Sequence, residues 1–478
     1  MHFSVPDTQE LIDEAGNAYL GYNVHINGLF HCTVRYKQLH NLHEQLSKDM
    51  EIPLPPFPPK KFFPLTANQQ EDRRLLLDKY IQTIGQNTTI NSTELLNGFL
   101  LNAQLEGAVY PIEDENLDIF FMNGSQVNLN VTQAENSGKI LRKVCKHIKL
   151  DDKFHQYFSL FIVYQDEGNF VVIRKLEEFE SPIITQRNMH KIETRIILGK
   201  WYWNIEFDLD LLQDSIASNL LYNQAVAEVE RGWVLTSEEI HQNLKILKEQ
   251  NQKDEFLKIV RSLRYYGYMQ FAPCMCDYPQ PGSKVLVSIG KNELNVRITS
   301  HESNQEEIGF KVTRMRCWRI TTLQEGNDKY EDNTECNLEL SFEYLMAKDH
   351  LQWITISSEQ AILMSVCLQS MIDELLFKSV GGIRNLELKG KSWTYISREG
   401  HSRIITGSHS TENKSVKEND VTPRVRAEPI IRKITERFSS AKVRKSSNNR
   451  SPIAHQQGRR NGDLLENNAF CMIGDDDL

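Results

Sequence analysis

Long apolar runs are missing from this sequence of 478 residues. No stretch approaches the roughly 18 consecutive apolar residues that a membrane-spanning helix needs. The opening residues, MHFSVPDTQE, also lack the basic and then apolar run of a signal peptide. Both absences indicate that any membrane contact is peripheral. At roughly 100 to 200 residues per domain, the length suggests about three folded units.

Cysteines at the spacing of zinc ligands are absent too. Eight cysteines are scattered along the chain, and the one close pair, Cys274 and Cys276, is spaced C-x-C. None of the fourteen histidines is paired at a ligand spacing with another candidate ligand. We therefore expect no metal site, and we interpret the cysteines as free thiols of a reducing compartment.

The usual catalytic motifs are also missing. The sequence contains no G-x-S-x-G, no G-x-x-x-x-G-K-[ST], no G-x-G-x-x-G after a strand and no H-E-x-x-H. A lipid-regulated hydrolase with a dispersed site would need clustered carboxylates, or a Ser or Cys paired with a base, in a cleft. The sequence shows neither, so we expect no catalytic residue, no cofactor and no enzymatic activity.

Positive charge is scarce except in one segment. Residues 381–460 carry 18 Lys and Arg against 7 Asp and Glu, whereas residues 461–478 carry 5 acids and no base. With an overall net charge of -9, the rest of the chain carries -15. A nucleic-acid domain would place its basic residues on a folded face, so this distribution argues against nucleic acid as a partner. A basic tail suits an anionic bilayer surface.

The composition after Gly382 is rich in Ser, Asn, Lys and Arg and has no sustained apolar period, which predicts a disordered tail over residues 381–478. Its end, NNAFCMIGDDDL, is different because large apolar residues gather there beside three acids. A free terminal carboxylate after an acidic run suits a basic groove with an apolar pocket. We expect a docking peptide that uses Ile473 and Leu478; the alternative is an ordinary acidic terminus.

The first 110 residues combine hairpin and helix signals. Asn27-Gly28 separates two alternating runs, which is a strong hairpin pattern. Apolar residues then recur at helical spacing over residues 36–46 and again over residues 71–84. Between them, six prolines within residues 53–64 exclude helix and central strand.

Three further units are expected over residues 113–380. Residues 113–200 read as strand, strand, helix, strand, strand, the order of a ubiquitin-like fold. Residues 205–271 have helical period almost throughout. Residues 272–380 read as short strands followed by one long helix, at whose start Ser357 and Gln360 have the spacing of a capping box.

Three basic pairs lie where the first unit changes element: Arg35 beside Tyr36, Lys60-Lys61, and Arg73-Arg74. A phosphoinositide head group needs this mixture, because a guanidinium grips phosphate bidentately, an ammonium adds a point charge and an aromatic face supports the ring. The alternative is three solvated basic pairs. Nearby apolar residues could enter a bilayer or pack in the core; these are Phe57, Phe62, Phe63 and Leu65.

The segments VRYKQLHNLHEQL, PPFPPKKFF and EDRRLLLDKYI resemble the three signature segments of the phox-homology (PX) domain. In that family the matching residues have known roles: Arg35 would hold the 3-phosphate, Tyr36 would pack under the inositol, Lys60 would meet the 1-phosphate and Arg73 would bind ring hydroxyls. The family usually has Ser or Thr after the aromatic residue. This sequence has Lys37 there.

Residues 113–380 resemble the three-lobed FERM module, with ubiquitin-like F1, helical F2 and PTB-like F3 lobes. A PX domain followed by this module is the plan of the PX-FERM sorting nexins. The segments MHFSVP, MRCWRI, CLQSMIDELL and IGDDDL favour the branch of sorting nexins 17 and 31, and 31 over 17. The family's peptide groove would correspond to Trp318, Ile372 and Leu376; a plain core is the alternative for all three.

The resemblance implies a multidomain α+β adaptor in the cytoplasm and on the cytoplasmic face of early endosomes. It would bind phosphatidylinositol 3-phosphate and NPxY or NxxY motifs of receptors such as integrin β tails and lipoprotein receptors, and its tail would recruit a recycling complex of the retriever type. F1 resembles Ras-associating domains, without a signature for a Ras-type GTPase. The rival hypothesis is a plasma-membrane cytoskeletal scaffold that reads a different phosphoinositide.

Overall fold

The computed structural model describes residues 1–50, 52–61, 63–108, 113–166, 169–189, 193–298, 306–323, 338–379, 392–406, 459–461 and 464–470. All the described residues belong to one compact unit. Within the described ranges, no helix is both long and apolar enough to cross a bilayer.

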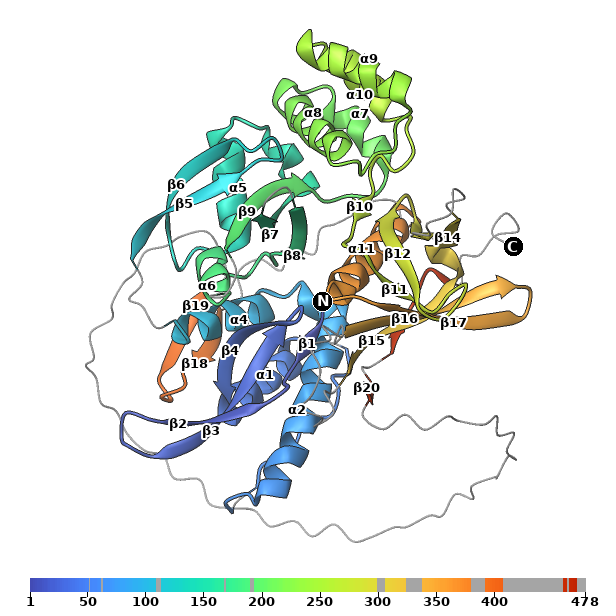
Figure 1. Ribbon diagram of the computed structural model, residues 1–478. Coiled ribbons are helices and arrows are strands. Elements are labelled where there is room, and N and C mark those ends of the chain that lie inside the picture. The colour runs from blue at the N-terminus through green and yellow to red at the C-terminus, as the bar shows by residue number, and fades with distance from the viewer. Residues whose placement is uncertain are drawn as a thin grey trace. The chain divides into compact units, whose positions relative to one another are not determined.

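The PX domain has a four-stranded antiparallel sheet and a helical layer (Figure 1). Asn27 and Gly28 form the turn between β3 and β4 with φ angles of 49° and 83°, which confirms the predicted hairpin. The described residues between the first two helices form neither helix nor strand, as the prolines predict. The elements are β1 (Phe3–Ser4), β2 (Thr8–Ile12), β3 (Ala18–Ile26), β4 (Leu29–Arg35), α1 (Tyr36–Asp49), α2 (Ala67–Gln86), α3 (Thr88–Asn91) and α4 (Glu94–Glu106).

The proline-rich loop divides its apolar residues between core and solvent. The ring of Phe57 stacks on His43 and meets Tyr80 edge-on, with both centroid distances at 4.9 Å, so it belongs to the core. Phe63, in contrast, is 84% exposed. Leu65 is half-buried, and Phe62 lies outside the described residues. Among the three candidates that the structure describes, Phe63 is therefore the best placed for bilayer insertion.

The F1 lobe is a five-stranded sheet in the order β6-β5-β9-β7-β8, with α5 packed on it. β9 runs parallel to β5. It is a fifth strand, whereas the sequence pattern predicted four. The elements are β5 (Asp114–Phe120), β6 (Gln126–Thr132), α5 (Ser137–His147), η1 (Asp152–Tyr157), β7 (Phe158–Asp166), β8 (Asn169–Lys175), α6 (Pro182–Arg187) and β9 (Thr194–Lys200).

The F2 lobe is helical, as predicted, and shares one apolar core with F1. Asp208 is fully buried at its start and accepts hydrogen bonds from Tyr202, Tyr266 and Arg261. These bonds satisfy a buried carboxylate that would otherwise be costly. The elements are η2 (Ile205–Phe207), α7 (Asp208–Leu211), α8 (Ser215–Glu230), α9 (Glu238–Glu249) and α10 (Lys253–Val260).

The F3 lobe is an antiparallel sheet closed by one long helix, α11, which packs against β15 and β16 (Figure 1). The predicted capping box at the start of α11 is wrong. Ser357 donates to Glu339 instead, and Gln360 bridges Ala272 and Val172. The elements are β10 (Met269–Gln270), β11 (Cys274–Cys276), β12 (Ser283–Gly290), β13 (Glu293–Ile298), β14 (Glu307–Lys311), η3 (Val312–Arg314), β15 (Met315–Leu323), β16 (Leu338–Ala347), β17 (His350–Ser357) and α11 (Ala361–Ser379).

Two parts of the predicted disordered tail are folded, which corrects that prediction. β18 (Ser392–Ile396) and β19 (Ser402–Thr406) form a hairpin whose Trp393 and Tyr395 are buried in the PX core. β20 (Arg459–Asn461) and β21 (Leu465–Glu466) pair with β15 of F3. Both segments are short and gain their stability from residues far away in the chain, so local composition could not reveal them.

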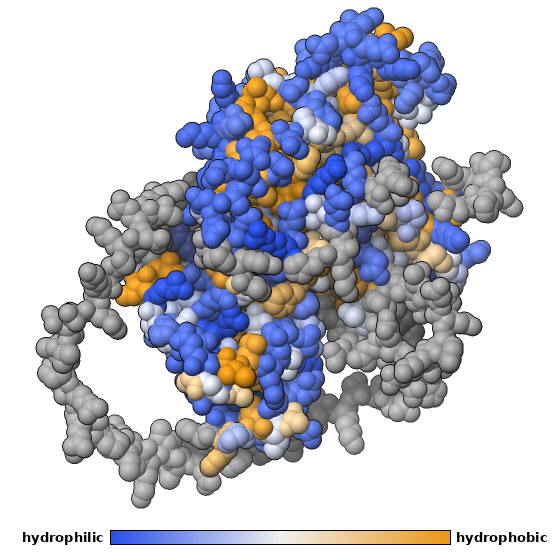
Figure 2. All heavy atoms as spheres, turned by 60° about the vertical axis from the view of Figure 1, so that its left-hand side comes forward, coloured by the Kyte–Doolittle hydropathy of each residue, from blue (hydrophilic) through white to orange (hydrophobic). Residues whose placement is uncertain are grey.

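The surface on one side of the molecule is mostly hydrophilic, and its apolar residues lie in small, separate patches (Figure 2). Scattered apolar residues of this kind are normal on a protein surface.

Candidate functional site

A cleft of about 400 Å³ opens in the PX domain between α1, the proline-rich loop and α2. Tyr36, Lys60 and Arg73 line it, so three of the four predicted head-group residues come together. Lys37 and Lys61 lie there as well, and were not among the predicted ligands. Among the described lining residues, four cations face one carboxylate, Glu44. The remaining lining residues are His40, Asn41 and Ile396.

Tyr36 organises the floor of this cleft. Its hydroxyl donates to the Pro58 carbonyl at 2.7 Å, which ties α1 to the proline-rich loop. The guanidinium carbon of Arg73 lies 4.3 Å from the centre of the Tyr36 ring. Arg73 is thereby held over an aromatic face. Arg74, the other member of the pair, is buried, binds Glu71 and the Val5 carbonyl, and is structural.

Arg35 is placed differently from the other three predicted residues. It ends β4 and precedes α1, but it is not among the described residues that line the cleft. Its guanidinium lies 3.8 Å from the centre of the Tyr19 ring, and its Nη1 donates to the Arg398 carbonyl at 2.9 Å. Arg398 belongs to the turn of the β18–β19 hairpin. The hairpin also supplies Ile396 to the cleft, a contribution that no motif indicated.

A second candidate site lies on F3, along the edge of β15 that faces away from β16. β20 and β21 occupy this edge as antiparallel strands, with Trp318 opposite Leu465 and Cys317 opposite Glu466. The F3 sheet therefore accepts an extended segment by strand addition, here from the same chain. This is the recognition mode in which backbone pairing gives affinity and side-chain pockets give specificity.

The segment ends in a turn anchored by one asparagine. The side-chain amide of Asn467 donates to the carbonyls of Val312 and Met315 at 2.8 and 2.6 Å. Its Oδ1 accepts the Ala469 N–H at 2.9 Å, and its carbonyl accepts the Phe470 N–H at 3.0 Å. Asn467 is 6% exposed and Ala469 is fully buried. Residues 467–470 thus dock as an N-x-x-F turn.

The predicted groove residues lie together in F3. Trp318 is fully buried, Ile372 is 1% exposed, and Leu376 packs on the same apolar cluster, which also contains Leu465 and Ala469. Membership of one cluster does not make them contacts of the docked segment, and the Trp318 side chain is a core residue. A core position is the alternative that the sequence analysis gave for Trp318.

Trp318 is connected to the start of the chain through one hydroxyl. Its Nε1 donates to the Ser365 Oγ at 2.8 Å, and the same Oγ is 2.7 Å from His2 Nε2. Burial lowers the pKa of His2 to about 3, so its imidazole is neutral at physiological pH. This contact ties the first residues of the PX domain to α11.

The N-x-x-F motif was not predicted from the sequence, although Asn467 and Phe470 stand within NNAFCMIGDDDL. The apolar and acidic residues of that segment predicted a docking peptide, and a groove for NxxY motifs was predicted separately, on F3. Ile473 and Leu478, the predicted docking residues, lie outside the described residues.

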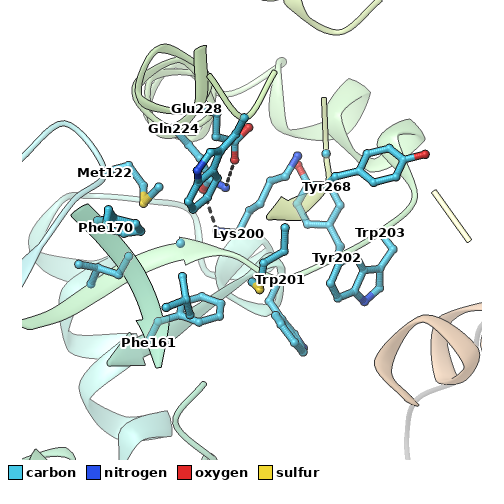
Figure 3. A pocket seen from close by; sticks show the side chains of 16 residues that line it. Met122, Phe161, Phe170, Lys200, Trp201, Tyr202, Trp203, Gln224, Glu228 and Tyr268 are labelled. Carbon is cyan, nitrogen blue, oxygen red and sulfur yellow. Dashed lines mark hydrogen bonds between the residues drawn. The ribbon is translucent and has the colours of Figure 1, made fainter. Parts of the chain in front are cut away.

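Another hollow lies where F1, F2 and F3 meet (Figure 3). It is lined by aromatic residues, among them Phe161, Phe170 and Trp201, and by one acid, Glu228, whose pKa is raised by burial. Gln224 donates to Glu228 at 2.9 Å. The cavity measures about 50 Å³, which suits one or two water molecules. It is too small for a peptide or a lipid head group.

Family models match the chain over most of its described length. Residues 22–103 match the PX domain, and residues 115–203 match the F1 lobe of the sorting nexin 17/27/31 FERM domain. Residues 204–264 match the F2 lobe of the sorting nexin 17/31 FERM domain. Residues 267–376 match the sorting nexin 17 FERM C-terminal domain. The predicted order of a PX domain and three FERM lobes is confirmed.

Curated relatives match the chain from end to end. Sorting nexin-17 of Danio rerio is 40% identical over 492 residues, and that of Homo sapiens is 39% identical over 486 residues, with all of both chains covered in each case. Sorting nexin-31 of Homo sapiens is 34% identical over 382 residues, which cover 79% of this chain and 86% of the relative. These identities are higher to sorting nexin-17, whereas the sequence segments favoured sorting nexin-31.

Proposed function

Because this chain belongs to the sorting nexin 17 and 31 family, we propose that it works on early endosomes as a cargo adaptor that binds two ligands. The family consists of sorting adaptors that associate peripherally with endosomal membranes. Its PX domain implies phosphoinositide binding, and its FERM-like module implies peptide-motif binding. The proposal names both ligands: phosphatidylinositol 3-phosphate and the NPxY or NxxY motifs of receptors.

The lipid assignment is supported by the charge and shape of the PX cleft. Four cations against one carboxylate suit a head group with phosphates at two positions. Lys60 would meet the 1-phosphate, Tyr36 would support the inositol and Arg73 would bind its hydroxyls. Arg35, which directly precedes Tyr36, would hold the 3-phosphate. The exposed Phe63 would enter the bilayer beside the head group and add apolar burial.

The peptide assignment depends most on one observation, the N-x-x-F turn of residues 467–470 docked beside β15. An NPxY or NxxY tail offers the same asparagine, followed by an aromatic residue at the same distance. Receptor tails such as those of integrin β chains or lipoprotein receptors would therefore take the edge that residues 464–470 now occupy. Cargo and the chain's own segment would compete for one site.

The end of the chain would carry the signal for recycling. Residues 471–478 follow the docked turn directly, and Ile473 and Leu478 would be read by a recycling complex of the retriever type. A receptor tail that displaces residues 464–470 would also detach the segment to which this signal is joined. Loading of cargo and recruitment of the recycling complex would then be coupled.

Replacement of Arg35 with alanine tests the lipid assignment. Losing a charge-assisted contact worth roughly 1.5 to 3 kcal/mol should weaken binding to phosphatidylinositol 3-phosphate vesicles about tenfold or more. The melting temperature should stay nearly constant, because the side chain is only half-buried. Arg142→Ala, which removes an exposed arginine from α5, is the matched control and should bind like the parent. Equal flotation of Arg35→Ala and the parent would refute the assignment.

A further inference from the structure

The β18–β19 hairpin follows the F3 lobe in sequence but is built into the PX domain. Trp393 is 6% exposed and Tyr395 1% exposed within the PX core. The side-chain amide of Gln45 on α1 pairs with the Thr394 backbone in both directions, with both distances at 2.7 Å. Gly98 on α4 makes room for the Trp393 ring, because a Cβ there would lie 2.1 Å from its Cζ2 atom.

A second set of contacts extends from the hairpin to the head-group site. Glu106, at the end of α4, accepts the Tyr395 hydroxyl at 2.8 Å and the Arg398 N–H at 3.2 Å. Gln38, buried near the start of α1, donates to the Ile396 carbonyl at 3.0 Å and accepts the Arg35 N–H at 2.9 Å. The strand-to-helix junction that carries Arg35 and Tyr36 is therefore bonded to the hairpin through Gln38.

We propose that the β18–β19 hairpin is part of the phosphoinositide site, where it positions Arg35 and closes one side of the cleft. The lipid-binding unit of this chain is then discontinuous: residues 1–108 together with residues 392–406. This inference rests on the proposed lipid function and adds Ile396, Arg398 and Glu106 to the residues on which it depends. Arg398 and Glu106 act as positioning residues.

The guanidinium of Arg35 is restricted from two sides, and the hairpin provides one of them. The Arg398 carbonyl of the hairpin accepts one N–H, and the ring of Tyr19 on β3 covers one face. A guanidinium carries five N–H donors, so most remain for a phosphate. A free arginine would lose much rotamer freedom on binding; one already held in place loses less, which raises affinity.

Ile396 contributes in a second way. It is the one aliphatic residue among the described residues that line the cleft, and its backbone is fixed by Gln38. An apolar wall lowers the local dielectric, so the charges of Lys60 and Arg73 act more strongly on a bound phosphate. Without the hairpin, this side of the cleft would open to water.

Gly98→Ala in the full-length chain tests the inference. The new methyl group occupies the space of the Trp393 ring, whereas alanine is favoured over glycine within a helix, so α4 should persist. We expect the affinity for soluble short-chain phosphatidylinositol 3-phosphate to fall about five- to tenfold. Discrimination against the 5-phosphate isomer should fall with it, because Arg35 is the group assigned to the 3-phosphate. Calorimetric titration measures both.

Three companion variants separate this effect from damage to the fold. Gly107→Ala lies at the end of the same helix, where the nearest atom to a Cβ is 3.4 Å away, and should bind like the parent. The double variant Gly98→Ala with Trp393→Phe should recover affinity, because phenylalanine lacks the indole atoms closest to the new methyl group. Trp393→Asp expels the hairpin by a second route and should reproduce the loss.

Hydrogen exchange over residues 392–406 reports whether the hairpin has left its site. An exposed hairpin with unchanged or higher lipid affinity would overturn the inference. A hairpin that stays protected in both Gly98→Ala and Trp393→Asp would also overturn it, because the Trp393 site would then not hold the hairpin. Failure of the parent itself to prefer the 3-phosphate over unphosphorylated phosphatidylinositol would contradict the proposed function instead.

Discussion

Replacement of Asn467 with aspartate is expected to raise the affinity of the full-length chain for an NPxY peptide by about tenfold to a hundredfold. The amide of Asn467 donates to the carbonyls of Val312 and Met315, and a carboxylate cannot. Two lost hydrogen bonds at roughly 1 kcal/mol each, with charge placed against two carbonyl oxygens, should release the docked segment. When the chain's own segment fills most of the sites, the apparent affinity for a peptide is the intrinsic affinity multiplied by the fraction of sites that are free. Release of the segment therefore raises the apparent affinity.

Fluorescence polarisation with a labelled NPxY peptide measures this change. Glu466→Gln is the matched control, because its side chain is exposed beside Asn467 and should leave the affinity unchanged. An Asn467→Asp variant that binds peptide no better than the parent would mean that the docked segment and cargo do not share the β15 edge. The competition in our proposal would then be wrong.

Replacement of Trp318 with alanine is expected to destabilise F3 by about 3 to 5 kcal/mol. The Trp318 side chain is fully buried, and its Nε1 donates a hydrogen bond to Ser365. Truncation leaves a cavity and removes the hydrogen bond that the indole donates to Ser365, and both losses lower the free energy of unfolding. Peptide binding should weaken as a consequence of lost structure.

Scanning calorimetry separates this from a direct role in the groove. Trp353→Ala on β17 is the control, since that side chain is 37% exposed in the same lobe and its removal should lower the melting temperature much less. If Trp318→Ala kept the melting temperature of the parent and still lost the peptide, Trp318 would be a ligand contact rather than a core residue.

Much of the fold could be predicted because its signals are local. The Asn27-Gly28 turn, the proline-rich loop and the helical period of α1 and α2 each depend on a few consecutive residues. The three basic segments were also visible, and the structure brings Tyr36, Lys60 and Arg73 into one cleft.

The parts that were missed depend on contacts between distant residues. Trp393 and Tyr395 alternate as in a strand, but that strand is stabilised by residues far earlier in the chain, among them Gly98 and Glu106, about 290 residues before it. The carbonyl that holds Arg35 belongs to the same hairpin, so the position of its guanidinium could not be read from its own segment. Gln360, similarly, is used between lobes rather than at its helix start.

The most direct test of a two-ligand endosomal adaptor is flotation of the full-length chain with liposomes. The panel contains phosphatidylinositol 3-phosphate, phosphatidylinositol 4,5-bisphosphate or no phosphoinositide, each with and without an NPxY peptide tethered to the bilayer. We expect strongest flotation where the 3-phosphate and the peptide are together, since a first contact raises the effective concentration of the second ligand. Equal or stronger flotation on the 4,5-bisphosphate, or no gain from the tethered peptide, would contradict the account.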